Sequence, residues 1–225
     1  MRSALIIGAT GAVGHHCLDM LLKDEFYGSV TALSRRNLGL HHPKLKEIVL
    51  DFDDLKSASE VFGVDDVFCC LGTTMKKAGS KEAFRKVDFE YPLEAARLAS
   101  KQGAKQFLMI TALGANPNSA IFYNRIKGEV EAAVRMLEFE GKFFFRPSLL
   151  IGERPETRIG EVLASQLFKF LGFLFVGPLK QYKAIGTETV ARAMVHIAKQ
   201  MLIGEHVIES AKIGKLFSVD KENNR

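Results

Sequence analysis

The stretch Ala4-Leu5-Ile6-Ile7-Gly8-Ala9-Thr10-Gly11-Ala12-Val13-Gly14 decides the fold of this chain. An apolar run typical of a buried strand breaks into three regularly spaced glycines, and the apolar spacing of a helix follows. A strand, a tight turn and a helix in this order predict an α/β fold with a doubly wound parallel sheet. The alternative interpretation is a glycine turn that binds nothing.

The spacing of these glycines is typical of a site for phosphate. Gly8 reaches backbone angles that are closed to other residues, and Gly11 has no Cβ to obstruct a pyrophosphate. Gly14 allows the helix to pack closely on the sheet. Because the first N–H groups of a helix and its positive dipole end attract anions, the stretch predicts a dinucleotide cradle.

Length and composition indicate one globular domain. The 225 residues suffice for a substantial core, and no low-complexity linker divides them. The net charge of +5 comes from scattered Lys and Arg, so nucleic-acid binding is not indicated, and an anionic small ligand explains the excess equally well. Because the first apolar strand is predicted so close to Met1, we expect no signal peptide. The cysteines and histidines show no metal-ligand spacing, so we predict a cytoplasmic protein without a metal site.

A second strand, expected over residues 29–33, ends in Ser34-Arg35-Arg36. In dinucleotide-binding folds an acidic residue at this point accepts hydrogen bonds from the ribose 2′-hydroxyl of NAD. Here two guanidinium groups stand instead, and they suit the 2′-phosphate of NADPH. A solvated basic loop is the alternative interpretation.

The third strand, expected over residues 46–50, is followed by Asp51-Phe52-Asp53-Asp54. Asp51 is placed to accept from the adenine amino group and Phe52 to cover the ring. Alternatively, the same residues simply cap the helix that follows. Both roles are compatible if Asp51 and Phe52 contact the ligand and Asp53 or Asp54 forms the cap.

The fourth strand, residues 66–71, ends in Gly72-Thr73-Thr74, whose small side chains leave room for a ligand at the carboxyl edge of the sheet. The loop after it carries Lys76, Lys77 and Lys81, for which solvation is favoured over contact with an anionic substrate. A helix over 87–102 and a strand over 106–111 follow.

Tyr123 and Lys127 are four residues apart, so they project from one face of the next helix. Thr111 ends the strand before it. A phenol with an ordinary pKa near ~10 needs roughly 4 kcal/mol of preferential phenolate stabilisation to act near neutral pH, and a nearby ammonium helps to provide it. The hydroxyl of Thr111 would orient the substrate oxygen. A half-buried tyrosine beside a solvated lysine is the alternative interpretation.

Taken together, these motifs resemble the atypical short-chain dehydrogenases/reductases, most closely the Tat-interacting oxidoreductase-like branch. The pieces Cys-Cys-Leu-Gly-Thr-Thr and Lys-Gly-Glu-Val-Glu are far more specific than the glycines. The matching stretches are residues 8–14, 34–36, 68–74, 87–88, 123–131 and 145–147.

The resemblance implies a Rossmann-type fold that holds NADPH. It implies cofactor contacts from Thr10, Gly11, Ala12 and Val13 at the pyrophosphate, Arg35 and Arg36 at the 2′-phosphate, Leu71, Gly72 and Thr73 at the fourth strand end, Tyr123 and Lys127 at the nicotinamide ribose, Leu150 at the nicotinamide, and Arg158. One departure stands out, because Thr111, followed by Ala112, replaces the usual serine. Threonine keeps the hydroxyl but adds a methyl group and stiffens χ1.

Residues 148–185 are expected to face the substrate. Within them, residues 162–179 are strongly apolar, and three interpretations remain for this segment: a pocket lid, an oligomer interface, or a peripheral contact with a membrane surface. Both a homodimer and a monomer are compatible with the sequence. A helix over 188–200 and a strand over 206–209 complete the domain.

The sequence thus predicts an NADPH-dependent oxidoreductase that reduces a small carbonyl substrate. Tyr123 would donate the proton, Lys127 would assist it and hold the ribose, and Thr111 would orient the oxygen. The alternatives are an NADPH-sensing binding protein with little turnover and a peripheral membrane factor that uses residues 162–179.

Overall fold

The computed structural model describes residues 1–152 and 183–216. Its central element is a parallel sheet in the order β3-β2-β1-β4-β5-β6-β9. The strands are β1 (Arg2–Ile7), β2 (Tyr27–Ser34), β3 (Leu45–Val49), β4 (Asp66–Cys69), β5 (Gln106–Ile110), β6 (Gly141–Arg146) and β9 (Gly204–Glu209). The predicted doubly wound α/β sheet is confirmed.

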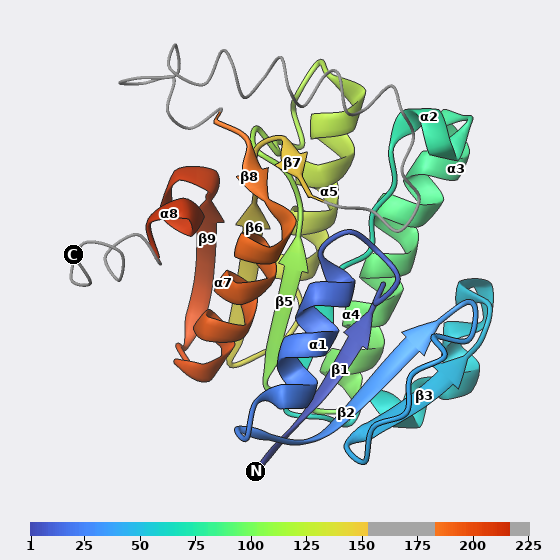
Figure 1. Cartoon of the computed structure of the whole chain (residues 1–225). Coiled ribbons are helices and arrows are strands. Elements are labelled where there is room, and N and C mark those ends of the chain that lie inside the picture. The colour runs from blue at the N-terminus through green and yellow to red at the C-terminus, as the bar shows by residue number, and fades with distance from the viewer. Residues whose placement is uncertain (153–182, 217–225) are drawn as a thin grey trace, which may run out of the picture.

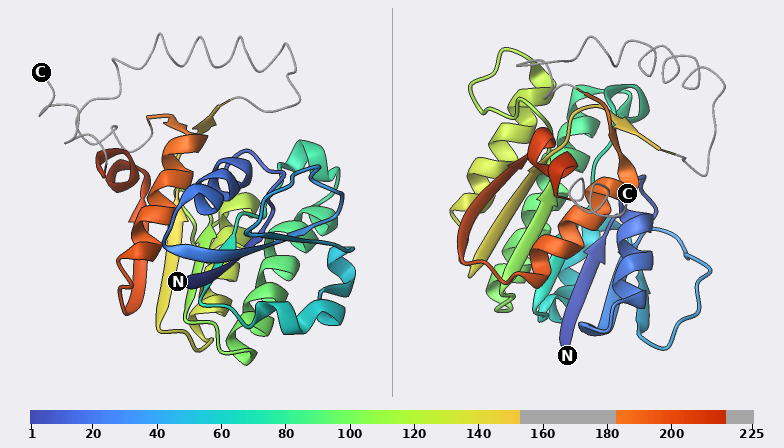
Figure 2. Two further views of the ribbon diagram at one scale, coloured as in Figure 1. Left: turned by 60° about the horizontal axis from the view of Figure 1, so that its bottom comes forward. Right: turned by 60° about the vertical axis from the view of Figure 1, so that its left-hand side comes forward.

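Helices cover both faces of this sheet (Figure 1). On one face α1 (Gly14–Lys23) packs against α7 (Thr187–Lys199), and on the other α4 (Tyr91–Lys101) lies between the 3-10 helix η1 (Phe52–Phe62) and α5 (Phe122–Arg135). Figure 2 shows the two helical layers separated by the sheet. The shorter elements are α2 (Met75–Ala78), α3 (Lys81–Arg85), the π-helical turn η2 (Lys86–Glu90), α8 (Ser210–Lys215), and a small sheet of β7 (Leu150–Ile151) and β8 (Ile185–Gly186).

The apolar run of β1 explains this layering. Successive side chains of a strand point to opposite faces, so Ala4 and Ile6 join the core beneath α1 and α7. Leu5 and Ile7 join the core beneath η1, α4 and α5. A strand covered on both faces is apolar at every position, which is why β1 reads as a continuous hydrophobic run.

The chain order reverses beside β1, because β2 lies on one side of it and β4 on the other. Parallel α/β sheets bind ligands at such a switch point, outside the carboxyl ends of the strands. The glycine turn after β1 and the Gly-Thr-Thr end of β4 therefore meet at one edge.

The opposite, amino edge of the sheet carries a closed polar cluster around Asp66. This carboxylate is fully buried and accepts from Arg2 Nε at 2.9 Å and Nη2 at 2.6 Å, from the Tyr27 hydroxyl at 2.9 Å, and from Gln106 Nε2 at 2.8 Å. Burial, together with the neighbouring Asp66 carboxylate, raises the pKa of Tyr27 well above its ordinary value. The cluster ties the first residues of β1, β2, β4 and β5 together.

Two sequence predictions fall outside the described residues: the contact of Arg158 with a cofactor and the role of segment 162–179. Within residues 1–152 and 183–216, none of the helices combines the length and the apolar character needed to cross a membrane.

Candidate cofactor and active site

A cavity of about 2140 Å³ opens at the carboxyl ends of the strands. Its volume exceeds the ~300–1,000 Å³ of an ordinary small-molecule pocket, so a dinucleotide and a second molecule fit together. The predicted site residues that line it are Gly8, Thr10, Gly11, Ala12, Val13, Arg35, Arg36, Phe52, Leu71, Gly72, Thr73, Thr111, Tyr123, Lys127 and Leu150. Residues scattered from β1 to β7 are thus gathered around one space.

The glycine turn forms the first wall of the cavity. Gly8 has φ of +88°, and a Cβ there would lie only 2.7 Å from the carbonyl oxygen of Cys70. A Cβ at Gly14 would collide with the carbonyl of Gly8, so both positions require glycine for close packing. No side chain caps the amino end of α1, and the cavity is lined just before it by residues 10–13, which lie outside the helix and present backbone N–H groups. These groups fit a pyrophosphate.

Arg35 and Arg36 follow β2, are exposed and line the cavity. The guanidinium carbon of Arg35 lies 5.8 Å from the ring centroid of Phe52, which also lines the cavity. Ser34 Oγ donates to the carbonyl oxygen of Arg36 at 2.7 Å and so fixes the turn that carries both arginines. Two cations and an aromatic face therefore stand together where the sequence predicts the adenosine.

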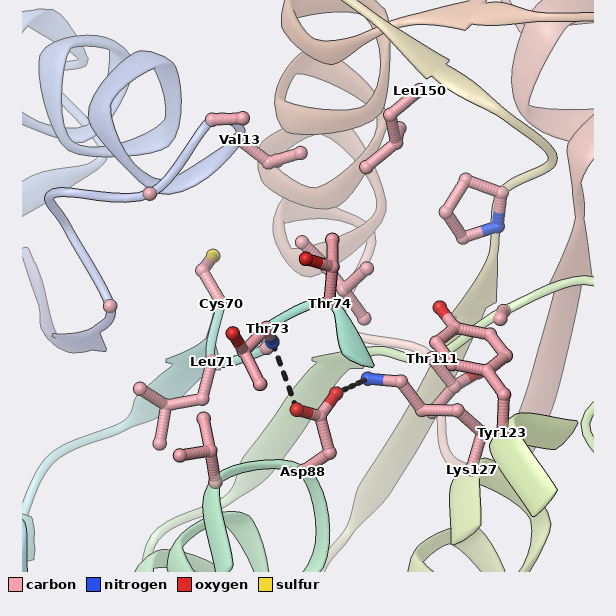
Figure 3. A pocket seen from close by; sticks show the side chains of 18 of the residues that line it. Val13, Cys70, Leu71, Thr73, Thr74, Asp88, Thr111, Tyr123, Lys127 and Leu150 are labelled. Atoms are coloured by element: carbon pink, nitrogen blue, oxygen red, sulfur yellow. Dashed lines mark hydrogen bonds and ion pairs between the residues drawn. The ribbon is translucent and has the colours of Figure 1, made fainter. Parts of the chain in front are cut away.

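Tyr123 and Lys127 lie on one face of α5, on the opposite side of the cavity (Figure 3). The Tyr123 hydroxyl points into the cavity, and its ring packs against Phe84 with centroids 5.5 Å apart. Lys127 is only 5% exposed, and its Nζ lies 2.7 Å from Oδ1 of Asp88. The predicted pair is therefore a hydroxyl facing the cavity beside a buried ammonium, rather than a tyrosine beside a solvated lysine.

The charge of Lys127 depends on its surroundings. Burial alone would lower the pKa of Lys127, but the Asp88 carboxylate, followed by Tyr123, outweighs burial and raises it above the ordinary value. The ammonium form is therefore held at the floor of the cavity.

A family model described as NAD(P)H-binding matches residues 8–138, more than half of the chain. The chain belongs to this NAD(P)H-binding family. The cavity described above fits such a cofactor, because its glycine turn, uncapped helix end and paired arginines supply N–H donors and cations for phosphate groups.

Protein HTATIP2 of Rattus norvegicus is 38% identical over 199 residues, which cover 87% of this chain and 80% of that protein. Protein fmp52, mitochondrial, of Emericella nidulans is 32% identical over 227 residues, covering 98% and 97%. The resemblance to the Tat-interacting oxidoreductase-like branch is thereby confirmed. Among solved structures, MoeE5 in complex with UDP-glucose and NAD is similar with a TM-score of 0.70 at 16% identity, over 92% of this chain and 75% of that one. This likeness shows the fold alone.

In this NAD(P)H-binding protein the hydroxyl of Thr111 is turned toward a buried acid. Oγ1 donates to Glu131 Oε1 at 2.6 Å, and the Phe145 carbonyl oxygen lies 3.3 Å away. Glu131 is fully buried and also accepts from Arg146 Nε at 2.9 Å and Nη2 at 2.6 Å. A hydroxyl has one proton to donate. Thr111 can therefore donate a hydrogen bond to a substrate oxygen only if it gives up its hydrogen bond to Glu131.

Asp51 is exposed and is not among the residues that line the cavity. Its Oδ1 accepts from the backbone N–H of Asp53 at 3.0 Å and caps η1. The capping alternative is therefore confirmed for Asp51, and the prediction that Asp53 or Asp54 forms the cap is wrong. Asp53 instead accepts from Lys86 Nζ at 2.7 Å and from the Tyr91 hydroxyl at 2.8 Å. These two donors, which are distant in the sequence, occupy the carboxylate in place of the backbone N–H groups of η1.

The basic loop behaves mostly as the solvated alternative predicts. Lys76, Lys77 and Lys81 are exposed, although Lys77 also lines the cavity. Thr74 caps α2 by accepting from the Lys77 backbone N–H at 3.2 Å. Among the residues that the structure describes, no group of three His, Cys, Asp or Glu side chains is placed to hold a metal ion.

Sequence reasoning missed Asp88 and Glu131 as site residues. Glu131 had a usable signal, because it follows Lys127 by four residues and therefore shares the helical face of Tyr123 and Lys127. Asp88 lies in a stretch that matches the family, residues 87–88, but local spacing does not pair it with Lys127, which lies on another helix.

Proposed function

We propose that this protein is an NADPH-dependent oxidoreductase that transfers hydride to a small carbonyl substrate. The observation that carries the proposal is the Tyr123 hydroxyl pointing into a dinucleotide-sized cavity beside the buried Lys127 ammonium. Bound NADPH supplies the hydride. Membership of an NAD(P)H-binding, oxidoreductase-like family is supported by the family model and the relatives.

Each residue has a distinct task in this proposal. Tyr123 donates its phenolic proton to the carbonyl oxygen, which gains negative charge as the hydride arrives. Lys127 holds positive charge beside the phenol and stabilises the phenolate that remains after the transfer. Thr111 supports the end of β5 through Glu131 on the same helical face as Tyr123 and Lys127. Leu150 lines the cavity from β7, where the resemblance places the nicotinamide.

Substitution of Tyr123 by Phe tests the catalytic part. Loss of a proton donor costs ~10²–10⁴-fold in rate, so NADPH oxidation with a panel of aldehydes and ketones should fall by that factor. NADPH affinity should change far less, because Phe keeps the ring and removes only one hydroxyl from the cofactor contacts. A variant indistinguishable from wild type with every active substrate would refute the enzymatic proposal.

Preference for NADPH over NADH is supported by Arg35 and Arg36, since paired guanidinium groups bind a phosphate in planar, bidentate fashion. Each charge-assisted hydrogen bond contributes about 1.5–3 kcal/mol. Calorimetry should therefore show NADPH binding at least about tenfold more tightly than NADH. Equal affinity would remove the NADPH assignment while leaving the enzymatic role intact.

The second candidate is an NADPH-sensing regulatory protein with little turnover. It is favoured by one observation: the Thr111 hydroxyl is committed to Glu131, and the next residue, Ala112, has no hydroxyl. A site with one proton donor instead of two hydroxyls binds cofactor without efficient chemistry. Tight NADPH binding without oxidation by any carbonyl in the panel would favour this candidate.

Partners and location remain proposals from the sequence. We expect a small-molecule substrate and no nucleic acid. We also expect a monomer or homodimer and a peripheral membrane contact through residues 162–179. Sedimentation without liposomes tests the oligomeric state, and sedimentation with liposomes tests the membrane contact. The cytoplasmic expectation is tested by cell fractionation, since the name of the Emericella nidulans relative assigns that protein to mitochondria.

A further inference from the structure

Asp88 is a buried acid on the wall of the cavity, and the proposed chemistry gives it no role. The side chain is 1% exposed and comes from η2, the π-helical turn between α3 and α4. Turns of this kind appear frequently at functional sites, because they redirect one side chain out of the helical repeat. Here the turn carries a carboxylate to the cavity.

Both carboxylate oxygens of Asp88 are committed to parts of the site (Figure 3). Oδ2 accepts from the backbone N–H of Thr73 at 2.9 Å, and Oδ1 lies 2.7 Å from Lys127 Nζ. Gly72 packs against the Asp88–Lys127 ion pair, since a Cβ at Gly72 would be 3.5 Å from Asp88 Oδ1 and 3.6 Å from Lys127 Nζ. Asp88 thus connects the strand end of β4 to the ammonium on α5.

Three titratable groups face Lys127: Asp88 from η2, Tyr123 from α5 and Cys69 from β4. Burial raises the pKa of the Cys69 thiol to about 12, so this group is neutral at physiological pH. Within residues 1–152 and 183–216, Asp88 is the carboxylate in ion-pair contact with Lys127. The orientation of the ammonium therefore depends on Asp88.

We propose that Asp88 is a positioning residue that acts on the bound cofactor through Lys127. An ammonium has three N–H donors, and the Asp88 carboxylate forms an ion pair with it on one side, 2.7 Å from Nζ. This ion pair holds the ammonium in place for the cofactor and keeps it charged. This inference rests on the proposed placement of the nicotinamide ribose at Lys127.

A double-mutant cycle on NADPH affinity separates this role from a structural one. Asp88→Asn keeps the size and the acceptor for Thr73 but removes the charge, and Lys127→Met removes the ammonium. We expect Asp88→Asn to weaken NADPH binding about tenfold when Lys127 is present and less than about twofold in the Lys127→Met background. Equal losses in both backgrounds would overturn the proposal.

The pH dependence of NADPH affinity provides a second readout. Without the Asp88 carboxylate, burial remains and lowers the pKa of Lys127, so the ammonium is lost at lower pH. The alkaline decline in affinity should therefore begin at lower pH in Asp88→Asn than in wild type and be absent in Lys127→Met. An unmoved decline in Asp88→Asn would contradict the proposal.

Asp66→Asn is the matched control, because Asp66 is an equally buried, cation-paired acid at the opposite edge of the sheet. It should change neither NADPH affinity nor its alkaline decline. If Asp88→Asn alone fails to fold, the comparison of Lys127→Met with the Asp88→Asn/Lys127→Met double variant still tests the proposal. The proposal requires the NADPH affinities of these two variants to agree within about twofold. Absence of NADPH binding by wild type would refute the proposed function as well, whereas equal losses from Asp88→Asn in the two backgrounds would overturn this inference alone.

Discussion

Two buried aspartates lie at opposite edges of the same sheet and differ in what surrounds them. At the amino edge, Asp66 accepts four hydrogen bonds from three side chains and is enclosed. At the carboxyl edge, Asp88 has one backbone donor and one ammonium, and it borders the cavity. Both acids are buried and paired with a cation, so what distinguishes them is their position relative to the cavity.

This contrast shows how a function is distinguished from a structural role at a buried ion pair. An ion pair at the edge away from the cavity serves mainly to hold the strands in order. An ion pair that borders the cavity is a candidate for contact with a ligand. The predictions below challenge or refine this distinction.

Replacement of Asp66 by Ala should produce the largest loss of stability. Removing one partner of a buried ion pair costs about 3–5 kcal/mol, because Arg2, Tyr27 and Gln106 lose their common acceptor. Urea unfolding measures the loss. NADPH affinity of the folded fraction should not change. A loss below about 1 kcal/mol would show that the amino-edge cluster is not the structural counterpart of the cofactor site.

Replacement of Thr111 by Val should have an intermediate effect. Glu131 loses a charge-assisted hydrogen bond worth about 1.5–3 kcal/mol, while Arg146 still binds it. Thr111→Ser is the control, because it keeps the hydroxyl and loses only a methyl group worth about 0.8 kcal/mol.

Turnover distinguishes the two roles of Thr111. A hydroxyl that only supports β5 should leave NADPH oxidation by Thr111→Val within about tenfold of wild type, well short of the ~10²–10⁴-fold loss of a proton-transfer group. A loss of that larger size at unchanged stability would assign Thr111 to the substrate after all.

The sequence was sufficient for those parts of the site that depend on local spacing. The glycine turn, the arginine pair and the Tyr123 and Lys127 pair each lie within a few residues, so periodicity and strand ends predict them. The same logic placed the strands of the sheet close to their observed bounds, because strands buried on both faces are apolar throughout.

Partners supplied by distant segments could not be predicted in this way. The helix expected over 87–102 is in fact the π-helical turn η2 followed by α4, and that turn directs Asp88 to Lys127. Any of three neighbouring acids satisfies the local rule for capping η1, and Asp53 is removed from that choice by contacts with Lys86 and Tyr91. In both cases, the position of Asp88 and the cap of η1, contacts with residues distant in the sequence determine the outcome, and local spacing does not predict such contacts.

The smallest expected effect concerns Asp65, beside Asp66 at the amino edge. Its carboxylate accepts from the Ser3 backbone N–H at 2.8 Å, the Ser3 hydroxyl at 3.1 Å and Lys105 Nζ at 2.8 Å. Burial would raise the pKa of Asp65, but these donors outweigh it and hold the pKa at about 2. An unfolded aspartate has a pKa near ~3.9, so the folded protein favours the charged form.

Because the folded pKa is the lower one, the stabilisation by Asp65 is complete above pH ~4 and is lost as pH falls toward about 2. Allowing for solvent screening, Asp65→Asn should unfold about 1 kcal/mol more easily at pH 6. The difference should vanish near pH 2 in urea titrations. The Lys127 pair has the opposite sign, since a raised lysine pKa stabilises at low pH and is lost as pH rises. An Asp65→Asn difference that persists unchanged at pH 2 would show that the lost hydrogen bonds, rather than the charge, account for its effect.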